Sequence, residues 1–122
     1  MIYLLSLRRL RLSVRLLALA VALAAASPRY EAVRAEDATI SIDNFTFAPE
    51  RLTLQAGTTV IWRNQDDIPH TVASTARLFK SSALDTDDTY SFTFTEPGTY
   101  EYFCSLHPRM TGTIVVEPRT AR

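Results

Sequence analysis

The feature that most constrains this chain is a series of short runs, from residue 36 onward, in which apolar and polar residues alternate. Such alternation in β-branched and aromatic residues, without helical spacing, indicates strands with one buried face. We therefore predict an all-β fold. The expected strands cover residues 39–47, 52–55, 58–63, 71–74, 90–95, 99–103 and 113–117. Seven to eight short strands favour a sandwich of two sheets.

The first of these strands contains a shift of register. Ile40 and Ile42 share one face, whereas Phe45 and Phe47 would lie on the other face of a regular strand. Because such a slip would expose one apolar pair, we expect a bulge or bend at Asp43–Asn44 that returns both pairs to the core.

Two turn signals join neighbouring strands further along the chain. Ala56–Gly57 and Glu96–Gly98 each separate two alternating runs, as hairpin connections do. Residues 75–89 are polar and irregular, with room for a helical turn, and Phe79 and Leu84 are their expected apolar anchors. Tyr100 is expected to be the corner tyrosine of a sandwich, with its hydroxyl bonded to the backbone.

The N-terminal segment has the composition of a secretory signal peptide. Four arginines between Arg8 and Arg15 precede the apolar run 16–26, which is shorter than a membrane span. Cleavage after Ala35 is preferred and cleavage after Ala26 stays open, so residues 1–35 are the expected signal and 36–122 the domain. An uncleaved anchor is the alternative. Arg8–Arg9 is only a weak twin-arginine signal because Arg11 stands where an apolar residue is expected.

The charge of residues 36–122 narrows the choice of partners. This part of the chain has twelve acidic and seven basic residues, a net charge of −5. Nucleic acid is therefore excluded as a partner, because binding to phosphates needs clustered Lys and Arg. With the signal removed we expect a soluble monomer in the periplasm, without stable membrane insertion.

The soft metal ligands of the expected domain form one pattern. Cys104 is the only cysteine of the chain and cannot form an internal disulfide. His107 and Met110 follow it at intervals of three, and His70 precedes another strand at a loop end of the sandwich. Two imidazoles, one thiolate and a long axial thioether are the ligands of a blue-copper site. Zinc is the competing metal, but it rarely takes a thioether.

These residues lie within a wider resemblance. The sequence resembles the cupredoxin family, and within it the amicyanins, over residues 52–64, Pro69–His70, 90–102 and the loop from Cys104 through Gly112. The resemblance implies a Greek-key β-sandwich and one copper ion cycling between Cu(I) and Cu(II). Its equatorial ligands would be His70, Cys104 and His107, and its axial ligand Met110.

Three residues depart from the family pattern. Thr71 replaces the usual Asn, Leu106 the usual Pro, and Arg109 a usual apolar residue. We expect Thr71 to bond across to the loop near Ser105, as groups around a metal site do. Leu106, Pro108 and Arg109 are expected to surround an exposed edge of His107 and form the docking surface for partners.

The resemblance implies a blue-copper electron-transfer protein that carries one electron between redox proteins and is not an enzyme. Its donor would be a quinoprotein amine dehydrogenase and its acceptor a c-type cytochrome. The domain lacks further His for the extra copper centres of an oxidase or reductase. A periplasmic copper-binding or copper-delivery protein is the alternative, and a metal-free interaction sandwich is a third.

Overall fold

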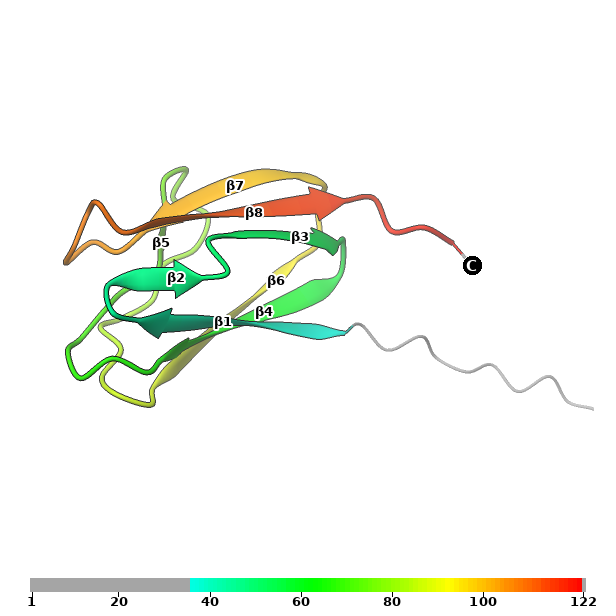
Figure 1. Ribbon diagram of the computed structural model, residues 1–122. Coiled ribbons are helices and arrows are strands. Elements are labelled where there is room, and N and C mark those ends of the chain that lie inside the picture. The colour runs from blue at the N-terminus through cyan, green and yellow to red at the C-terminus, as the bar shows by residue number, and fades with distance from the viewer. Residues whose placement is uncertain (1–35, 122) are drawn as a thin grey trace, which may run out of the picture. The chain divides into compact units, whose positions relative to one another are not determined.

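Two four-stranded sheets form the fold in the computed structural model, which describes residues 36–121 (Figure 1). The first sheet has the order β2 (Thr46–Ala48), β1 (Asp37–Asp43), β4 (Thr58–Asn64) and β6 (Thr89–Phe94). The second has the order β3 (Arg51–Gln55), β8 (Thr111–Glu117), β7 (Gly98–Phe103) and β5 (Ala73–Ser74). The predicted β-sandwich is confirmed. The predicted signal peptide, and with it the domain boundary at residue 35, lies outside the described residues.

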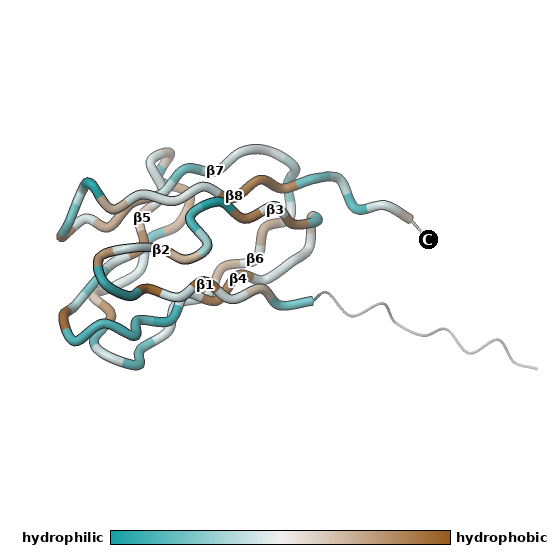
Figure 2. Tube along the Cα trace, in the orientation of Figure 1, coloured by the Kyte–Doolittle hydropathy of each residue, from teal (hydrophilic) through white to brown (hydrophobic). Residues whose placement is uncertain are grey.

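The core lies between the sheets and follows the alternation of the sequence. Ile40 and Ile42 of β1 are fully buried, and Ile114 and Val116 of β8 are buried opposite them. Trp62 of β4 is the largest fully buried side chain. In Figure 2, hydrophobic and hydrophilic segments follow one another along the strands. The period-two pattern therefore identified the inward face of each sheet.

The corner tyrosine is present where the sequence predicted it. The hydroxyl of Tyr100 donates a hydrogen bond to the carbonyl oxygen of Glu96 at 2.6 Å. This contact closes the turn before β7.

No segment of residues 36–121 forms a helix that is long and apolar enough to cross a membrane.

The two predicted hairpins are wrong. The turn at Ala56–Gly57 joins β3 to β4, and the turn at Glu96–Gly98 joins β6 to β7, but in each case the two strands belong to different sheets. The backbone N–H of Ala56 bonds to the carbonyl of Glu117 in the second sheet, while that of Gly57 bonds to Phe94 in the first. At both positions, therefore, a short turn connects a strand of one sheet to a strand of the other sheet.

The predicted strand 39–47 is two strands joined by a tight turn, not one strand with a bulge. β1 pairs antiparallel with β2, and Asp43 lies opposite Thr46, so Asn44 and Phe45 form a two-residue connection. Both have left-handed backbone, with φ of 46° and 58°, as the common two-residue hairpin turn requires. Phe47 is buried, but Phe45 is 51% exposed and does not join the core.

Residues 75–88 form an irregular connection without a helical turn, and Thr89 already belongs to β6. Phe79 and Leu84 are buried, as predicted, and anchor it to the core. The strand predicted for residues 71–74 is reduced to β5. Instead of a longer strand, His70 forms an isolated bridge with Leu84.

A glycine in β8 is required by a neighbouring aromatic ring. A Cβ atom at Gly112 would overlap the ring of Tyr102 on the paired strand β7. Tyr102 is 1% exposed, so its ring has little room to move. We expect Gly112→Ala to destabilise the domain by about 1 to 3 kcal/mol, the usual cost of overpacking a core. Urea unfolding of the variant and of Thr111→Ala, its exposed neighbour on β8, measures the difference; equal midpoints would contradict the steric role of Gly112.

Candidate metal centre

Three side chains from two distant segments meet at one end of the sandwich. Nδ1 of His70 and Nδ1 of His107 lie 3.8 and 3.7 Å from Sγ of Cys104. The ligand atoms of all three lie within 4.8 Å of one another. The β7–β8 loop, which carries Cys104 and His107, lies at the end of the sandwich away from the C-terminus (Figure 1).

These distances fit a single metal ion. Imidazole nitrogen and thiolate sulfur bind metals at about 2.0 and 2.3 Å. Two such ligands at the 120° angle of a trigonal plane are then about 3.7 Å apart, close to both sulfur–nitrogen distances here. Met110 adds a thioether on the same loop, and its side chain is 5% exposed. Two imidazoles, one thiolate and one thioether are the donor types that a blue-copper site uses.

The β7–β8 loop is closed by its own backbone. The N–H of Cys104 donates to the carbonyl of Met110 at 3.0 Å, and the N–H of Met110 donates to His107 at 2.9 Å. The N–H of His107 donates to the carbonyl of Cys104 at 3.2 Å. Because the strands on both sides pair in register, the short loop holds Cys104, His107 and Met110 at the same end of the sandwich.

Thr71 ties the His70 segment to the β7–β8 loop. Its hydroxyl oxygen accepts a hydrogen bond from the N–H of Ser105 at 2.7 Å and lies 2.7 Å from the Ser105 hydroxyl. The backbone N–H of Thr71 donates to Cys104 Sγ at 3.3 Å. The structure thus places Thr71 and Ser105 where the sequence analysis expected an interaction between the two segments.

The thiol of Cys104 lies in an environment that favours the thiolate. Burial raises its pKa, but this effect is outweighed by hydrogen bonds from the Thr71 N–H, His70, the Thr71 hydroxyl and His107. Together they lower the pKa of Cys104 to about 6. The thiolate is the form of cysteine that binds a metal.

A carboxylate fixes the buried histidine from its other side. Nε2 of His70 lies 2.9 Å from Oδ2 of Asp66, and the His70 side chain is fully buried. The hydrogen bond with His70, followed by one from the N–H of Phe45, lowers the pKa of Asp66. The carboxylate of Asp66 accepts a hydrogen bond from Nε2–H and so orients the ring with Nδ1 toward Cys104.

The loop before His70 is organised around a buried amide. The side-chain nitrogen of Asn64, at the end of β4, donates to the carbonyls of Ile68 and Leu84 at 2.8 and 2.9 Å. Its side-chain oxygen accepts the N–H of Asp66 at 2.9 Å. Asn64 is fully buried and therefore holds both Asp66 and the chain leading to His70.

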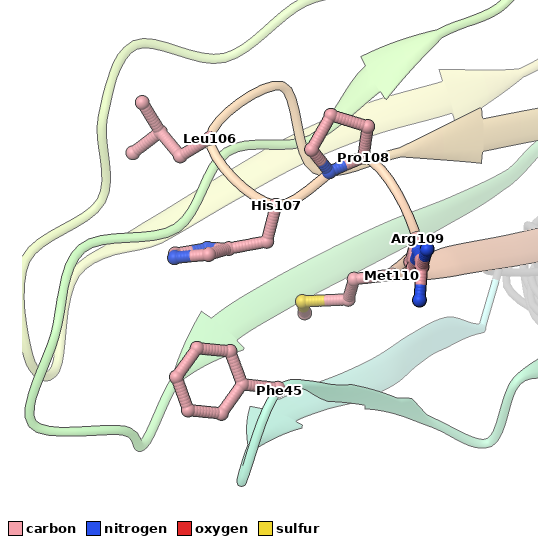
Figure 3. A pocket seen from close by; sticks show the side chains of 6 residues that line it. All are labelled: Phe45, Leu106, His107, Pro108, Arg109 and Met110. Atoms are coloured by element: carbon pink, nitrogen blue, oxygen red, sulfur yellow. The ribbon is translucent and has the colours of Figure 1, made fainter.

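A shallow depression of about 460 Å³ borders the centre on its open side. Its lining consists of Phe45, Leu106, His107, Pro108, Arg109 and Met110. In Figure 3 the side chains of His107 and Met110 extend from the loop toward the ring of Phe45. Leu106, Pro108 and Arg109 are exposed, and His107 is partly exposed.

Three residues of this site were missed by the sequence analysis. Asp66 was counted only as an acidic residue, although a carboxylate four residues before a candidate histidine ligand is a signal of support for that ligand. Asn64 was assigned no role. Phe45 was expected in the core, and no local pattern indicated that it would lie beside both histidines.

Comparisons with known proteins identify the family of this chain. The family described as cupredoxin-like domain matches residues 15–116. The amicyanin of Paracoccus denitrificans is 36% identical over 95 residues, covering 72% of this chain and 72% of that protein. Amicyanin-alpha of Methylorubrum extorquens is 34% identical over 119 residues, covering 85% of this chain and 100% of that protein.

Solved structures show the same fold. A purple cupredoxin from Nitrosopumilus maritimus is 36% identical, with a TM-score of 0.63 over 66% of this chain and 100% of that chain. The Cu(I) form of an amicyanin mutant is 34% identical, with a TM-score of 0.64 over 70% of this chain and 86% of that chain.

Proposed function

Because this chain belongs to the cupredoxin family, it is a blue-copper electron-transfer protein with one copper ion and not an enzyme, and we propose that it carries electrons between redox proteins of the periplasm. Export is supported by the signal-like composition of residues 1–35. The alternative role, copper binding for delivery, is not favoured by the comparisons with amicyanins.

His70, Cys104, His107 and Met110 are the residues that would hold the copper ion. The observation that carries this assignment is the convergence of the two Nδ1 atoms on Cys104 Sγ at 3.8 and 3.7 Å. When bound, copper supplies the Cu(I)/Cu(II) couple. Thr71, Ser105 and Asp66 hold the ligands in one arrangement, which limits the rearrangement that accompanies a change of charge.

The absorption spectrum of the purified protein tests this function. After addition of Cu(II), we expect an intense visible band from thiolate-to-copper charge transfer, bleached by ascorbate and restored by an oxidant. Weak d–d absorption alone, or absence of copper uptake, would contradict the blue-copper centre. Rapid exchange of copper with a chelator, combined with slow electron exchange, would favour copper delivery instead.

The exposed surface around His107 is the proposed site of electron exchange. His107 is the partly exposed member of the three, and Leu106 and Pro108 provide exposed apolar surface beside it. Arg109 adds a positive charge to the rim of a domain with a net charge of −5. We propose a quinoprotein amine dehydrogenase as donor and a c-type cytochrome as acceptor, with an acidic group facing Arg109. Stopped-flow mixing with each protein tests the two assignments.

Charge reversal at Arg109 tests the docking surface. We expect Arg109→Glu to lower the second-order rate constant with the donor by roughly threefold to tenfold at low salt, because rim charges act mainly on association. The effect should shrink as salt screens the charge. Arg119→Glu, which reverses an exposed charge after β8 and outside the depression, is the control. Equal rates for the two variants would remove Arg109 from the docking surface.

A further inference from the structure

Phe45 has a conformation and an exposure that the fold alone does not require. Its φ of 58° lies in the left-handed region, which is unfavourable for a bulky side chain. The position is the second residue of a two-residue hairpin turn, where glycine is preferred. The ring is 51% exposed and contributes little to the core. A strained aromatic residue beside a metal centre points to a role for its ring there.

The ring of Phe45 contacts both histidines of the centre. Its centroid lies 5.0 Å from that of His107 and 5.5 Å from that of His70, with interplanar angles of 86° and 90°. Perpendicular aromatic contacts at these separations are attractive. Figure 3 shows the ring across the depression from the β7–β8 loop, facing His107 and Met110. Phe45 therefore forms the wall of the centre opposite that loop.

The backbone of Phe45 is attached to the support of His70. Its N–H donates to Oδ2 of Asp66 at 3.2 Å, the same oxygen that lies 2.9 Å from His70 Nε2. One carboxylate oxygen thus fixes the hairpin turn relative to the buried imidazole. Because this bond comes from the backbone, substitution at residue 45 removes the ring but keeps the anchor.

The two histidines differ in how they are held. His70 is fully buried and has Asp66 on its outer nitrogen. For His107, the ring hydrogen bond to the described residues is with Cys104 Sγ at 3.7 Å. The contact with Phe45 therefore restricts the movement of the outer edge of the His107 imidazole.

We propose that Phe45 is a positioning residue of the metal centre: its ring restricts rotation of the His107 imidazole and closes the centre to small external ligands. This inference rests on the proposed copper site. It gives the strained turn a role, because the left-handed backbone at residue 45 accompanies a ring that contacts both histidines and an N–H that bonds to Asp66.

The first test uses the copper-free protein. We expect Phe45→Ala to increase the mobility of the His107 ring, measured by NMR relaxation of its carbon-bound protons, whereas Phe45→Tyr retains the wild-type mobility. Leu106→Ala is the matched control, since Leu106 is 52% exposed and lines the same depression without a ring contact to either histidine. Unchanged mobility in Phe45→Ala, or an equal increase in Leu106→Ala, would overturn the proposal.

The second test uses the Cu(II) protein and azide as the external ligand. Azide binding is measured by the change in the visible spectrum. We expect Phe45→Ala to bind azide about tenfold or more tightly than the wild type does, because the apolar surroundings of a metal site control access to it. Phe45→Tyr and Leu106→Ala should follow the wild type. Equal azide affinities in wild type and Phe45→Ala would overturn the role of the ring in exclusion.

The two tests separate this inference from the proposed function. A wild-type protein that forms no intense visible band would refute the blue-copper centre, whatever Phe45 does. A wild-type protein that forms the band, together with a Phe45→Ala variant that matches it in ring mobility and azide affinity, would refute the role of Phe45 alone. Thermal unfolding of each variant shows whether the fold is retained.

Discussion

Cys104→Ser is expected to abolish the intense visible band of the copper-loaded protein completely. The band requires a thiolate, and Cys104 is the only cysteine of the chain. The hydrogen bonds that lower the pKa of Cys104 to about 6 show that its surroundings support a negative sulfur. A serine hydroxyl has no comparable thiolate chemistry. Absorption spectroscopy during Cu(II) titration measures the loss.

The fold should survive this substitution. Serine is smaller than cysteine, and its oxygen can accept the Thr71 N–H that now bonds to Cys104 Sγ. Leu106→Ala, in the same loop, should keep the band and serves as the control. A Cys104→Ser protein that still showed the intense band would exclude Cys104 as the copper ligand, and the ligand set would have to be revised.

Asp66→Ala is expected to weaken copper binding by about 10- to 100-fold, the usual effect of removing a group that supports a metal ligand. Its carboxylate lies 2.9 Å from His70 Nε2 and orients the ring so that Nδ1 faces Cys104. The substitution also removes the acceptor of the Phe45 N–H. Competition with a chelator of known affinity measures the change.

Two further variants separate the causes. Asp66→Asn keeps an oxygen acceptor without the charge, so we expect an affinity between those of Asp66→Ala and the wild type. Asp67→Ala removes the adjacent exposed carboxylate and should bind copper as the wild type does. If Asp66→Ala and Asp67→Ala bound copper equally well, the carboxylate next to His70 would have no part in ligand positioning.

The two wrong hairpin predictions show that local sequence patterns do not determine which strands pair. Ala56–Gly57 and Glu96–Gly98 have the composition of tight turns, and tight turns are present there, but each connects strands of different sheets. The alternation of apolar and polar residues shows which side chains of a strand face inward. The same alternation is expected whether the next strand pairs with it in one sheet or lies in the facing sheet. The choice between these arrangements depends on which other strands each strand pairs with: β3 and β7 pair with β8 in the second sheet, whereas β4 and β6 pair with each other in the first.

Sequence patterns alone were enough to predict the all-β class, the inward faces of the strands and the candidate ligand set. These are properties of local periodicity and of residue chemistry: Cys104, His107 and Met110 are three residues apart in one loop, and His70 is the only other histidine. The tertiary structure alone decided how these donors are supported. Asp66 and Phe45 are 21 residues apart, yet one carboxylate oxygen joins the Phe45 backbone to His70. Contacts of this kind arise only when separate loops meet at one end of the sandwich, because no local pattern specifies which loops become neighbours.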